Sequence, residues 1–266
     1  MHRRRARPGL GTYIEIDMAV RGPAHGDTAI DAAFATIDHI EACMSPHRCE
    51  SDVARINRAA IGERVAIAAA TREVLAMARM LHHESGGFFD CTVASDGVER
   101  TNARATLTDL EFVAPCVVVK RKALRIDLGG IAKGYAVDRA VMALVASGTT
   151  GGCVNAGGDL RVFGGTTRRV HLRDPRDPTR LVPLINLFDA ALATSANYFS
   201  ADALVTPARR AVRRVAFDAG ASVSVLASSC MLADALTKIV SLSGDVHHPL
   251  LAHHDAEAIV VAANLA

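Results

Sequence analysis

Midway along the chain the sequence reads Ile126-Asp127-Leu128-Gly129-Gly130-Ile131-Ala132-Lys133-Gly134-Tyr135-Ala136-Val137-Asp138. The pattern predicts a short strand, a glycine turn and the start of a helix that carries a lysine. This arrangement suits a phosphate, because glycines let backbone N–H groups approach it, and the helix N-terminus and Lys133 add positive charge. It matches neither the P-loop nor the G-x-G-x-x-G fingerprint, so from the residues alone the glycine pair is either a phosphate site or only a tight turn.

The composition is that of an ordinary globular protein. The chain has 266 residues, of which 50% are hydrophobic, and a formal net charge of +2, so neither a disordered chain nor a nucleic-acid partner is indicated. The six cysteines are scattered without a C-x-x-C pair, which favours free thiols and a reducing compartment. The first residues contain no apolar leader and no spanning stretch, so we expect a cytoplasmic protein without a membrane segment.

Hydrophobic periodicity predicts helices and strands along the whole chain. A basic tail at residues 1–11 is expected to precede a strand at residues 13–16, and Asp27 is expected to cap the helix that follows. Further helices are predicted at residues 71–85, 131–146 and 229–242, and strands at residues 116–120, 124–128, 153–155, 170–172, 181–187, 222–226 and 258–262. No repeat or linker divides them, so residues 12–266 are predicted to form one α+β domain with mixed sheets and packed helices.

Further segments accompany the central one in a definite order. Early in the chain are Met44-Ser45-Pro46-His47 with residues 50–57, followed by Ser85-Gly86-Gly87-Phe88-Phe89-Asp90-Cys91-Thr92-Val93. Later come Val154-Asn155-Ala156-Gly157-Gly158-Asp159-Leu160, Ala193-Thr194-Ser195 and Ala233-Asp234-Ala235-Leu236-Thr237. With the central stretch, these segments resemble the ApbE family of FAD:protein FMN transferases over nearly the whole chain.

The resemblance implies an enzyme that uses FAD as its substrate. It implies that a divalent cation, normally Mg²⁺, bridges the FAD diphosphate and that FMN passes to a threonine hydroxyl of an acceptor protein, with release of AMP. In phosphoryl transfer a protein mainly positions groups and neutralises charge, so a metal together with Lys133 would be an adequate minimum. Two other functions stay open, namely a protein that binds FAD without transfer and a hydrolase that converts FAD to FMN and AMP.

The resemblance also implies the site residues. The cofactor-binding set contains His47, Phe88, Phe89, Asp90, Asp127, Lys133, Gly157, Gly158, Asp159 and Ser195, and the metal set contains Gly130, Asp234 and Thr237. No catalytic residue is predicted. Structural alternatives stay open: the phenylalanines could be core residues, Asp90 could cap a turn, Gly157-Gly158-Asp159 could form a hairpin turn, and Asp234 could assist a helix N-terminus.

Three positions differ from the family pattern. The family's His-x-x-Asp-Pro-x-Thr-Gly-x-Pro segment corresponds to residues 203–212, where only Pro207 remains. Loss of the histidine as a general base would cost about a hundredfold to ten-thousandfold in rate unless another group replaces it. The early aromatic residue is His47. The family often places a metal-binding threonine four residues after the aspartate, where this chain has Lys238. An ammonium there would either repel a metal or substitute for it.

Overall fold

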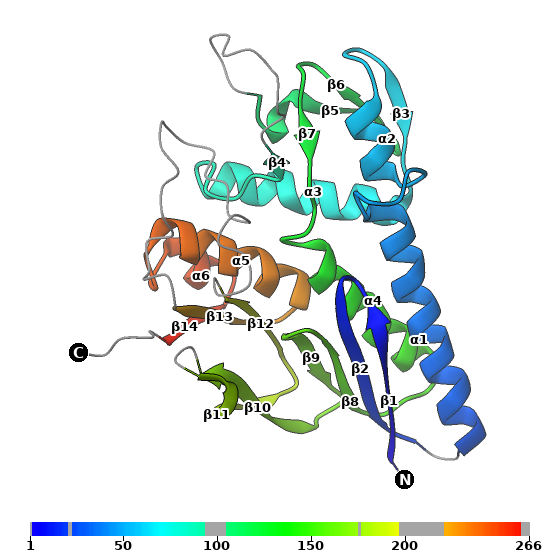
Figure 1. The fold of residues 1–266 in the computed structure, drawn as a ribbon, viewed down its shortest axis with the longest axis vertical. Coiled ribbons are helices and arrows are strands. Elements are labelled where there is room, and N and C mark those ends of the chain that lie inside the picture. Colours follow the sequence, from blue (N-terminus) through cyan, green and yellow to red (C-terminus); the bar gives the residue numbers. More distant parts are fainter. Residues whose placement is uncertain (1, 21–22, 94–104, 175–176, 197–220, 262–266) are drawn as a thin grey trace.

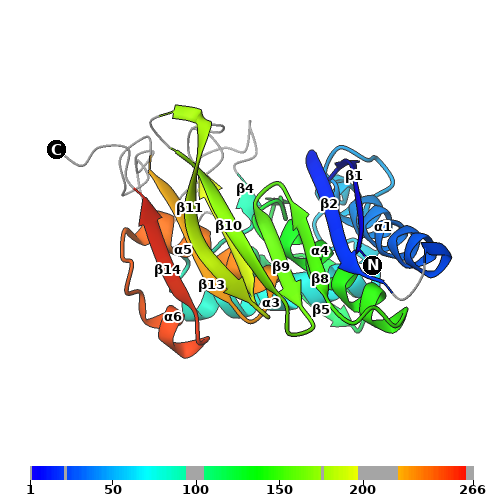
Figure 2. The same ribbon diagram turned by 90° about the horizontal axis from the view of Figure 1, so that it is seen from below.

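The largest sheet has seven strands and is antiparallel throughout. The computed structural model describes residues 2–20, 23–93, 105–174, 177–196 and 221–261. Across the sheet the order of strands is β1 (His2–Gly9), β2 (Thr12–Ala19), β8 (Gly152–Ala156), β9 (Asp159–Phe163), β12 (Ala191–Ala196), β13 (Ser222–Ala227) and β14 (Glu257–Val261). The first and last strands of the chain therefore form its two opposite edges (Figure 2).

Long helices cover one face of this sheet. They are α1 (Pro23–Met44), α4 (Ala132–Ala146) and α5 (Cys230–Ser243) (Figure 1). In β2 the side chains of Ile14, Ile16 and Met18 are fully buried in the main core, as expected where alternate residues of a strand face the same layer. Burial of one such side chain contributes about 1.5–3 kcal/mol, so this layer contributes substantially to stability.

A hairpin packs on the opposite face of the sheet. It consists of β10 (Thr167–Asp174) and β11 (Asp177–Phe188), and Figure 2 shows it in front of the sheet strands. Leu160, Val170, Leu187 and Leu192 belong to a second, smaller apolar cluster between the hairpin and the sheet. The sheet is therefore covered on both faces in this part of the molecule.

The middle of the chain forms a separate layer beyond the helices (Figure 1). Its elements are α2 (Asp52–Arg58), α3 (Ala69–Glu84), the small sheet of β3 (Arg64–Ala66), β6 (Val117–Lys120) and β5 (Leu110–Ala114), the pair β4 (Thr92–Val93) and β7 (Arg125–Ile126), and the 3₁₀ turn η1 (Leu107–Asp109). Asp52 joins α2 to α3, because its buried carboxylate accepts hydrogen bonds from the Ala68 N–H and the Thr71 hydroxyl. The short α6 (Pro249–His253) precedes β14.

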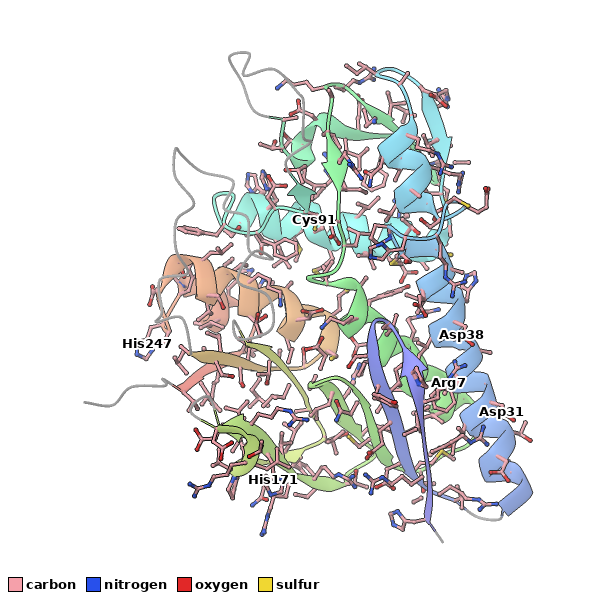
Figure 3. All side chains as sticks on the ribbon, viewed as in Figure 1. Arg7, Asp31, Asp38, Cys91, His171 and His247 are labelled. Carbon is pink, nitrogen blue, oxygen red and sulfur yellow. The ribbon has the colours of Figure 1, made fainter. Side chains whose placement is uncertain are left out.

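The N-terminal segment is a strand and not the predicted basic tail. Every second residue of β1 from Arg3 to Arg7 is only partly exposed, and these arginines pair with carboxylates on α1. Arg5 bonds to Asp31, and the Arg7 guanidinium donates to Asp38 at 2.6 Å (Figure 3). The basic residues therefore have partners on a helix, and their spacing of two is that of a strand.

The predicted α+β class is confirmed, and the helix predictions agree closely with the structure. The helices expected at residues 71–85, 131–146 and 229–242 correspond to α3, α4 and α5. Asp27 does not cap α1, because that helix begins at Pro23. The sequence reading missed the strands β1, β3, β4, β5, β9 and β12 and the short helices α2 and α6. Among the described residues, no helix is both long and apolar enough to cross a membrane.

Candidate functional site

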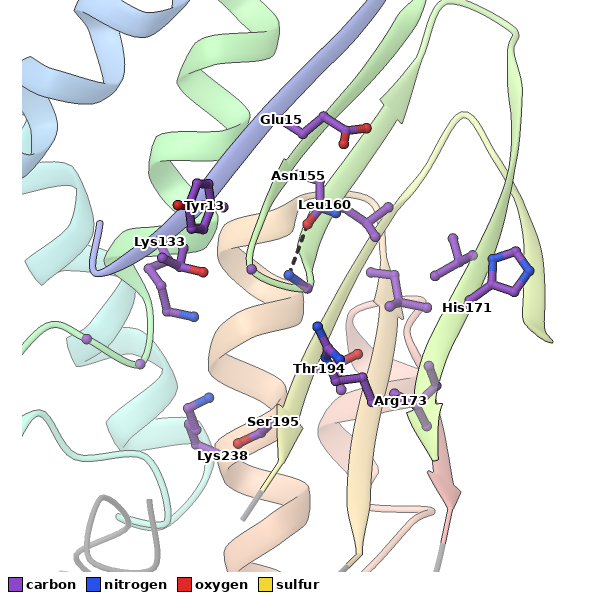
Figure 4. Close-up of a pocket in the computed structure, with 18 of the residues that line it drawn as sticks. Tyr13, Glu15, Lys133, Asn155, Leu160, His171, Arg173, Thr194, Ser195 and Lys238 are labelled. Carbon is purple, nitrogen blue, oxygen red and sulfur yellow. Dashed lines mark hydrogen bonds between the residues drawn. The ribbon is translucent and has the colours of Figure 1, made fainter. Parts of the chain in front are cut away.

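A cavity of about 1060 Å³ opens between the β10–β11 hairpin, the main sheet and the start of α4. Its volume is slightly above the range of about 300–1,000 Å³ for small-molecule sites. Nine of the predicted site residues line it, namely Phe88, Phe89, Asp90, Asp127, Gly130, Lys133, Gly157, Gly158 and Ser195. Residues from distant parts of the sequence therefore line the same cavity, part of which is drawn in Figure 4.

The glycine turn before α4 brings Lys133 to the cavity wall. Ile131 precedes the helix and offers no side-chain cap. The Ala132 N–H donates to the Leu128 carbonyl and the Gly134 N–H to Asp234, which leaves the Lys133 N–H of this turn suited to an anion. Lys133 forms an ion pair with Asp159, whose side chain is 2% exposed. Burial alone would lower the pKa of the Lys133 ammonium, but the carboxylates of Asp234 and Asp159 outweigh burial and raise that pKa. Lys133 is therefore a permanent positive charge at the site.

Two carboxylates connect α4 and α5 reciprocally. Asp138 on α4 accepts hydrogen bonds from the N–H groups of Cys230 and Met231, both at 2.9 Å, at the start of α5. Asp234 on α5 accepts a hydrogen bond from the Gly134 N–H at 3.3 Å, in the first turn of α4. Each helix thus receives a negative charge at its N-terminus, where such a charge is stabilising. Asp234 therefore does assist a helix N-terminus, as the structural alternative predicted, but the helix is α4 and not α5, to which Asp234 belongs.

The predicted metal residues lie next to Lys238. Asp234 and Thr237 are fully buried, and they lie behind the cavity wall. The Lys238 ammonium donates to Asp234 Oδ1 at 3.3 Å and to Thr237 Oγ1 at 3.1 Å. Its stem passes over Gly130, since a Cβ atom on that glycine would lie 3.3 Å from Lys238 Cε. An ammonium group therefore lies among the oxygen ligands that the sequence predicted for a divalent cation.

Phe88, Phe89 and Asp90 have separate roles. Phe89 is 4% exposed and belongs to the core, whereas Phe88 is half-buried and its ring lies edge-on to His248. Asp90 Oδ1 accepts hydrogen bonds from the N–H and the hydroxyl of Thr92, which is the turn-capping alternative. Asp90 Oδ2 is buried and has no hydrogen-bond partner among the described residues, although His82 Nδ1 lies 3.7 Å from it. It can therefore still accept a hydrogen bond from a donor group.

The turn between β8 and β9 contains Gly157 and Gly158, both with positive φ (66° and 105°). The Asn155 side chain accepts a hydrogen bond from the Gly158 N–H at 2.9 Å (Figure 4). The hairpin-turn alternative is therefore present, with Asp159 as the first residue of β9. The turn also faces the cavity, so the structural role and a ligand role are compatible at these glycines.

Comparisons with known proteins agree on one family. The sequence profile of the ApbE family matches residues 10–260. The chain belongs to the ApbE family. It is 29% identical to the FAD:protein FMN transferase of Vibrio cholerae serotype O1, over 90% of this chain and 80% of that protein. It is 32% identical to the FAD:protein FMN transferase of Rhodobacter capsulatus, over 55% of this chain and 29% of that longer protein.

The fold of this ApbE family member matches solved structures over nearly its full length. The apo form of the Pseudomonas stutzeri flavinyl transferase ApbE superposes with a TM-score of 0.80 at 22% identity, covering 98% of this chain and 91% of that one. At this identity the match concerns the fold. The predicted membership of the ApbE family and the single-domain fold are thus confirmed together.

Four predicted residues do not line the cavity of this ApbE protein. Asp159, Asp234 and Thr237 lie directly behind it and act through Lys133 and Lys238. His47 is exposed in the turn after α1, where its N–H donates to Ser45 Oγ at 3.3 Å. The segment around Pro207, where the family histidine is missing, lies outside the described residues.

Sequence reasoning missed the wall that the hairpin contributes. Arg168, His171 and Leu172 of β10 line the cavity, as does Tyr13, which is 72% exposed. Alternation of polar and apolar residues predicted a strand here. The position of this strand over the cavity depends on how the strands pair, and a single sequence does not show that pairing.

Proposed function

We propose that this chain transfers FMN from FAD to a threonine hydroxyl of an acceptor protein, with release of AMP. Membership of the ApbE family and the names of the relatives support a transferase that uses FAD. The observation that carries the proposal is one cavity lined by Lys133 and Lys238, by the rings of Tyr13 and Phe88 and by apolar residues. Figure 4 shows Tyr13 beside Lys133 and Leu160 across the cavity from them. Such a cavity suits a dinucleotide, which joins a charged diphosphate to flat rings.

The proposed reaction forms a bond from the threonine oxygen to the flavin-side phosphorus. The bond from that phosphorus to the bridging oxygen breaks, AMP leaves with this oxygen, and the hydroxyl proton is released. Negative charge accumulates on the leaving phosphate. The Lys133 and Lys238 ammonium groups, with the backbone N–H of Lys133 in the first turn of α4, are the groups of this site suited to neutralise it. Fixed charges of this kind do most of the work in phosphoryl transfer.

The walls support a role in ring binding. Tyr13 and Phe88 offer flat rings, and Leu160 and Leu192, which are almost fully buried in the smaller apolar cluster, form the wall behind them on β9 and β12. Aromatic faces stack on ring systems and contribute about 0.5–1.5 kcal/mol beyond the burial of area. In this proposal Phe88 and Asp90 lie on the adenine or ribose side, and Asp90 Oδ2, which makes no hydrogen bond but lies 3.7 Å from His82 Nδ1, accepts a ligand N–H or O–H.

Magnesium dependence was predicted together with this reaction. The cation would need Asp234, Thr237 and the carbonyl of Gly130, because Mg²⁺ prefers oxygen ligands at about 2.0–2.1 Å. In this chain the Lys238 ammonium is bonded to Asp234 and Thr237, so the set as it stands does not fit a divalent cation. The positive charge in the proposed reaction therefore comes from the lysines.

The test is incubation of the purified protein with FAD and a threonine-bearing candidate acceptor, followed by chromatography of AMP, FMN and the acceptor. The expected result is AMP in amounts equal to flavin-labelled acceptor. Lys133→Met is the matched control, because it keeps the length of the side chain and removes the charge, and it should lose most of the product. AMP with FMN and no label would indicate the hydrolase alternative. FAD bound and returned intact would indicate the binding alternative, and no binding of FAD would refute all three.

The cytoplasmic location also remains a proposal. All six cysteines lie in the described residues and are free thiols, which supports a reducing compartment. The acceptor protein would then have to present its threonine in the same compartment.

A further inference from the structure

The side chain of Lys238 is fixed in place by its surroundings. It extends from α5 one turn after Asp234, its ammonium bonds to Asp234 Oδ1 and Thr237 Oγ1, and its stem packs on Gly130. Only 20% of the side chain is exposed. The ammonium is therefore held at one point, and it is not a mobile charge on the rim of the cavity.

Every side-chain oxygen of Asp234 and Thr237 has a partner within the protein. Asp234 Oδ2 accepts the Gly134 N–H, and Asp234 Oδ1 accepts Lys238. The Thr237 hydroxyl donates to the backbone oxygen of Asp234 at 2.7 Å and accepts from Lys238. A carboxylate prepared for a cation would keep an oxygen without a partner, and here none is left. A divalent cation would also have to enter beside an ammonium that repels it.

Each of the two lysines at this end of the cavity is paired with a buried carboxylate. Lys133 pairs with Asp159, and Lys238 pairs with Asp234, so two ammonium groups face two buried carboxylates. Figure 4 shows Lys133 and Lys238 on the same side of the cavity. An ammonium has three N–H donors, and Lys238 uses two of them on Asp234 and Thr237. The third remains for a ligand oxygen.

We propose that the Lys238 ammonium takes the place of the divalent cation in this chain and contacts the FAD diphosphate directly, so that FAD binds without a divalent metal. The inference rests on the proposed function for the identity of the ligand. The exclusion of the metal is independent of the proposed function, because it follows from the contacts of Lys238.

The first experiment is a titration of the protein with FAD, followed by flavin fluorescence, in EDTA and in millimolar MgCl₂. The dissociation constant of the wild-type protein should be the same in both. Lys238→Thr opens the space over Gly130 and leaves Asp234 Oδ1 without its partner. This variant should bind FAD about 10–100-fold more weakly in EDTA, the range expected for loss of a charge-assisted hydrogen bond. Added Mg²⁺ should restore much of that loss.

Lys238→Met is the matched control. Methionine keeps a long stem over Gly130 but carries no charge, so this variant should bind FAD as weakly as Lys238→Thr in EDTA and should gain less from Mg²⁺. Wild-type binding that disappears in EDTA and returns with Mg²⁺ would overturn the proposal, and this measurement needs no variant.

A second measurement does not depend on FAD. Mn²⁺, whose free and bound forms differ in their electron paramagnetic resonance signal, is titrated into the protein alone. The wild-type protein should bind no Mn²⁺ that competes with Mg²⁺, whereas Lys238→Thr should bind one ion. If the wild-type protein binds Mn²⁺ and Asp234→Asn does not, the proposal that Lys238 takes the place of the metal is wrong. Failure of FAD to bind under any condition would instead refute the proposed function and the contact with the diphosphate.

Discussion

The crossing of α4 and α5 at Gly134 allows a sharp test of how the site is built. An added Cβ atom at Gly134 would lie 2.2 Å from the backbone oxygen of Cys230 and 2.8 Å from Cα of Met231. These are backbone atoms at the start of α5, so they cannot turn aside as the end of a side chain can. The substitution Gly134→Ala therefore has to push the two helices apart by about 1 Å to reach ordinary contact.

The expected magnitude follows from two opposing effects. Alanine is favoured over glycine inside a helix by about 1 kcal/mol, whereas overpacking of a close contact costs about 1–3 kcal/mol and sometimes more. Because the clash at Gly134 is with backbone, we take the upper end of that range. Gly134→Ala should then destabilise the protein by about 2 kcal/mol, which corresponds to a fall in Tm of about 4–8 °C for a domain of this size.

The assay is thermal unfolding followed by circular dichroism, with Gly26→Ala as the control. Gly26 also lies in a helix, but an added Cβ would meet side-chain and not backbone atoms, namely Val20 Cγ1 at 2.8 Å and Arg3 Cγ at 3.0 Å. That variant should retain the wild-type Tm within a few degrees, or exceed it. A Gly134→Ala protein that melts at or above the wild-type temperature would refute the close approach of the two helices.

Other variants test the stability of the fold and the electrostatics of the site. Burial raises the pKa of Asp159 to about 6, so lowering the pH through 6 should neutralise a carboxylate beside Lys133 and strengthen FAD binding roughly tenfold. Asp159→Asn should remove that step from a fluorescence titration repeated across pH. Phe89→Ala should cost about 3–5 kcal/mol in urea unfolding, whereas Phe88→Ala should cost less stability and weaken FAD binding more. Arg7→Ala should cost about 1 kcal/mol in the same unfolding assay, because the Arg7 guanidinium lies 4.4 Å from the centre of the Phe34 ring on α1. If this variant loses no stability, the N-terminal segment behaves as the predicted basic tail.

Helices were predictable from the sequence because their signal is local. In α3, Val74, Leu75, Ala78 and Leu81 repeat at three and four residues and are all fully buried, so one stretch of chain contains the whole pattern. The end of α5 was equally readable, since Gly244 adopts the left-handed conformation that follows many helices.

Strand β1 was missed because its burial depends on a distant helix. Consecutive basic residues usually form a solvated segment, and the spacing of Arg3, Arg5 and Arg7 has meaning only beside α1. The same limit applies to the site. The central stretch with Lys133 was found from sequence, but the β10 wall and the position of His47 outside the cavity follow from strand pairing and turn geometry.

The buried carboxylate of Asp234 explains why a lysine is tolerated at position 238. Asp234 is needed structurally, because it accepts the Gly134 N–H in the first turn of α4. A buried carboxylate without a counter-charge is unstable in its ionised form, so a chain that gives up the cation needs another positive charge at the same place. An aspartate followed four residues later by a lysine is a favourable helix pair, and Lys238 meets that requirement from the same helix. Exchange of a metal for a lysine would then leave the contact between α4 and α5 intact. The cavity would bind a diphosphate through an ammonium group and would no longer require a divalent cation.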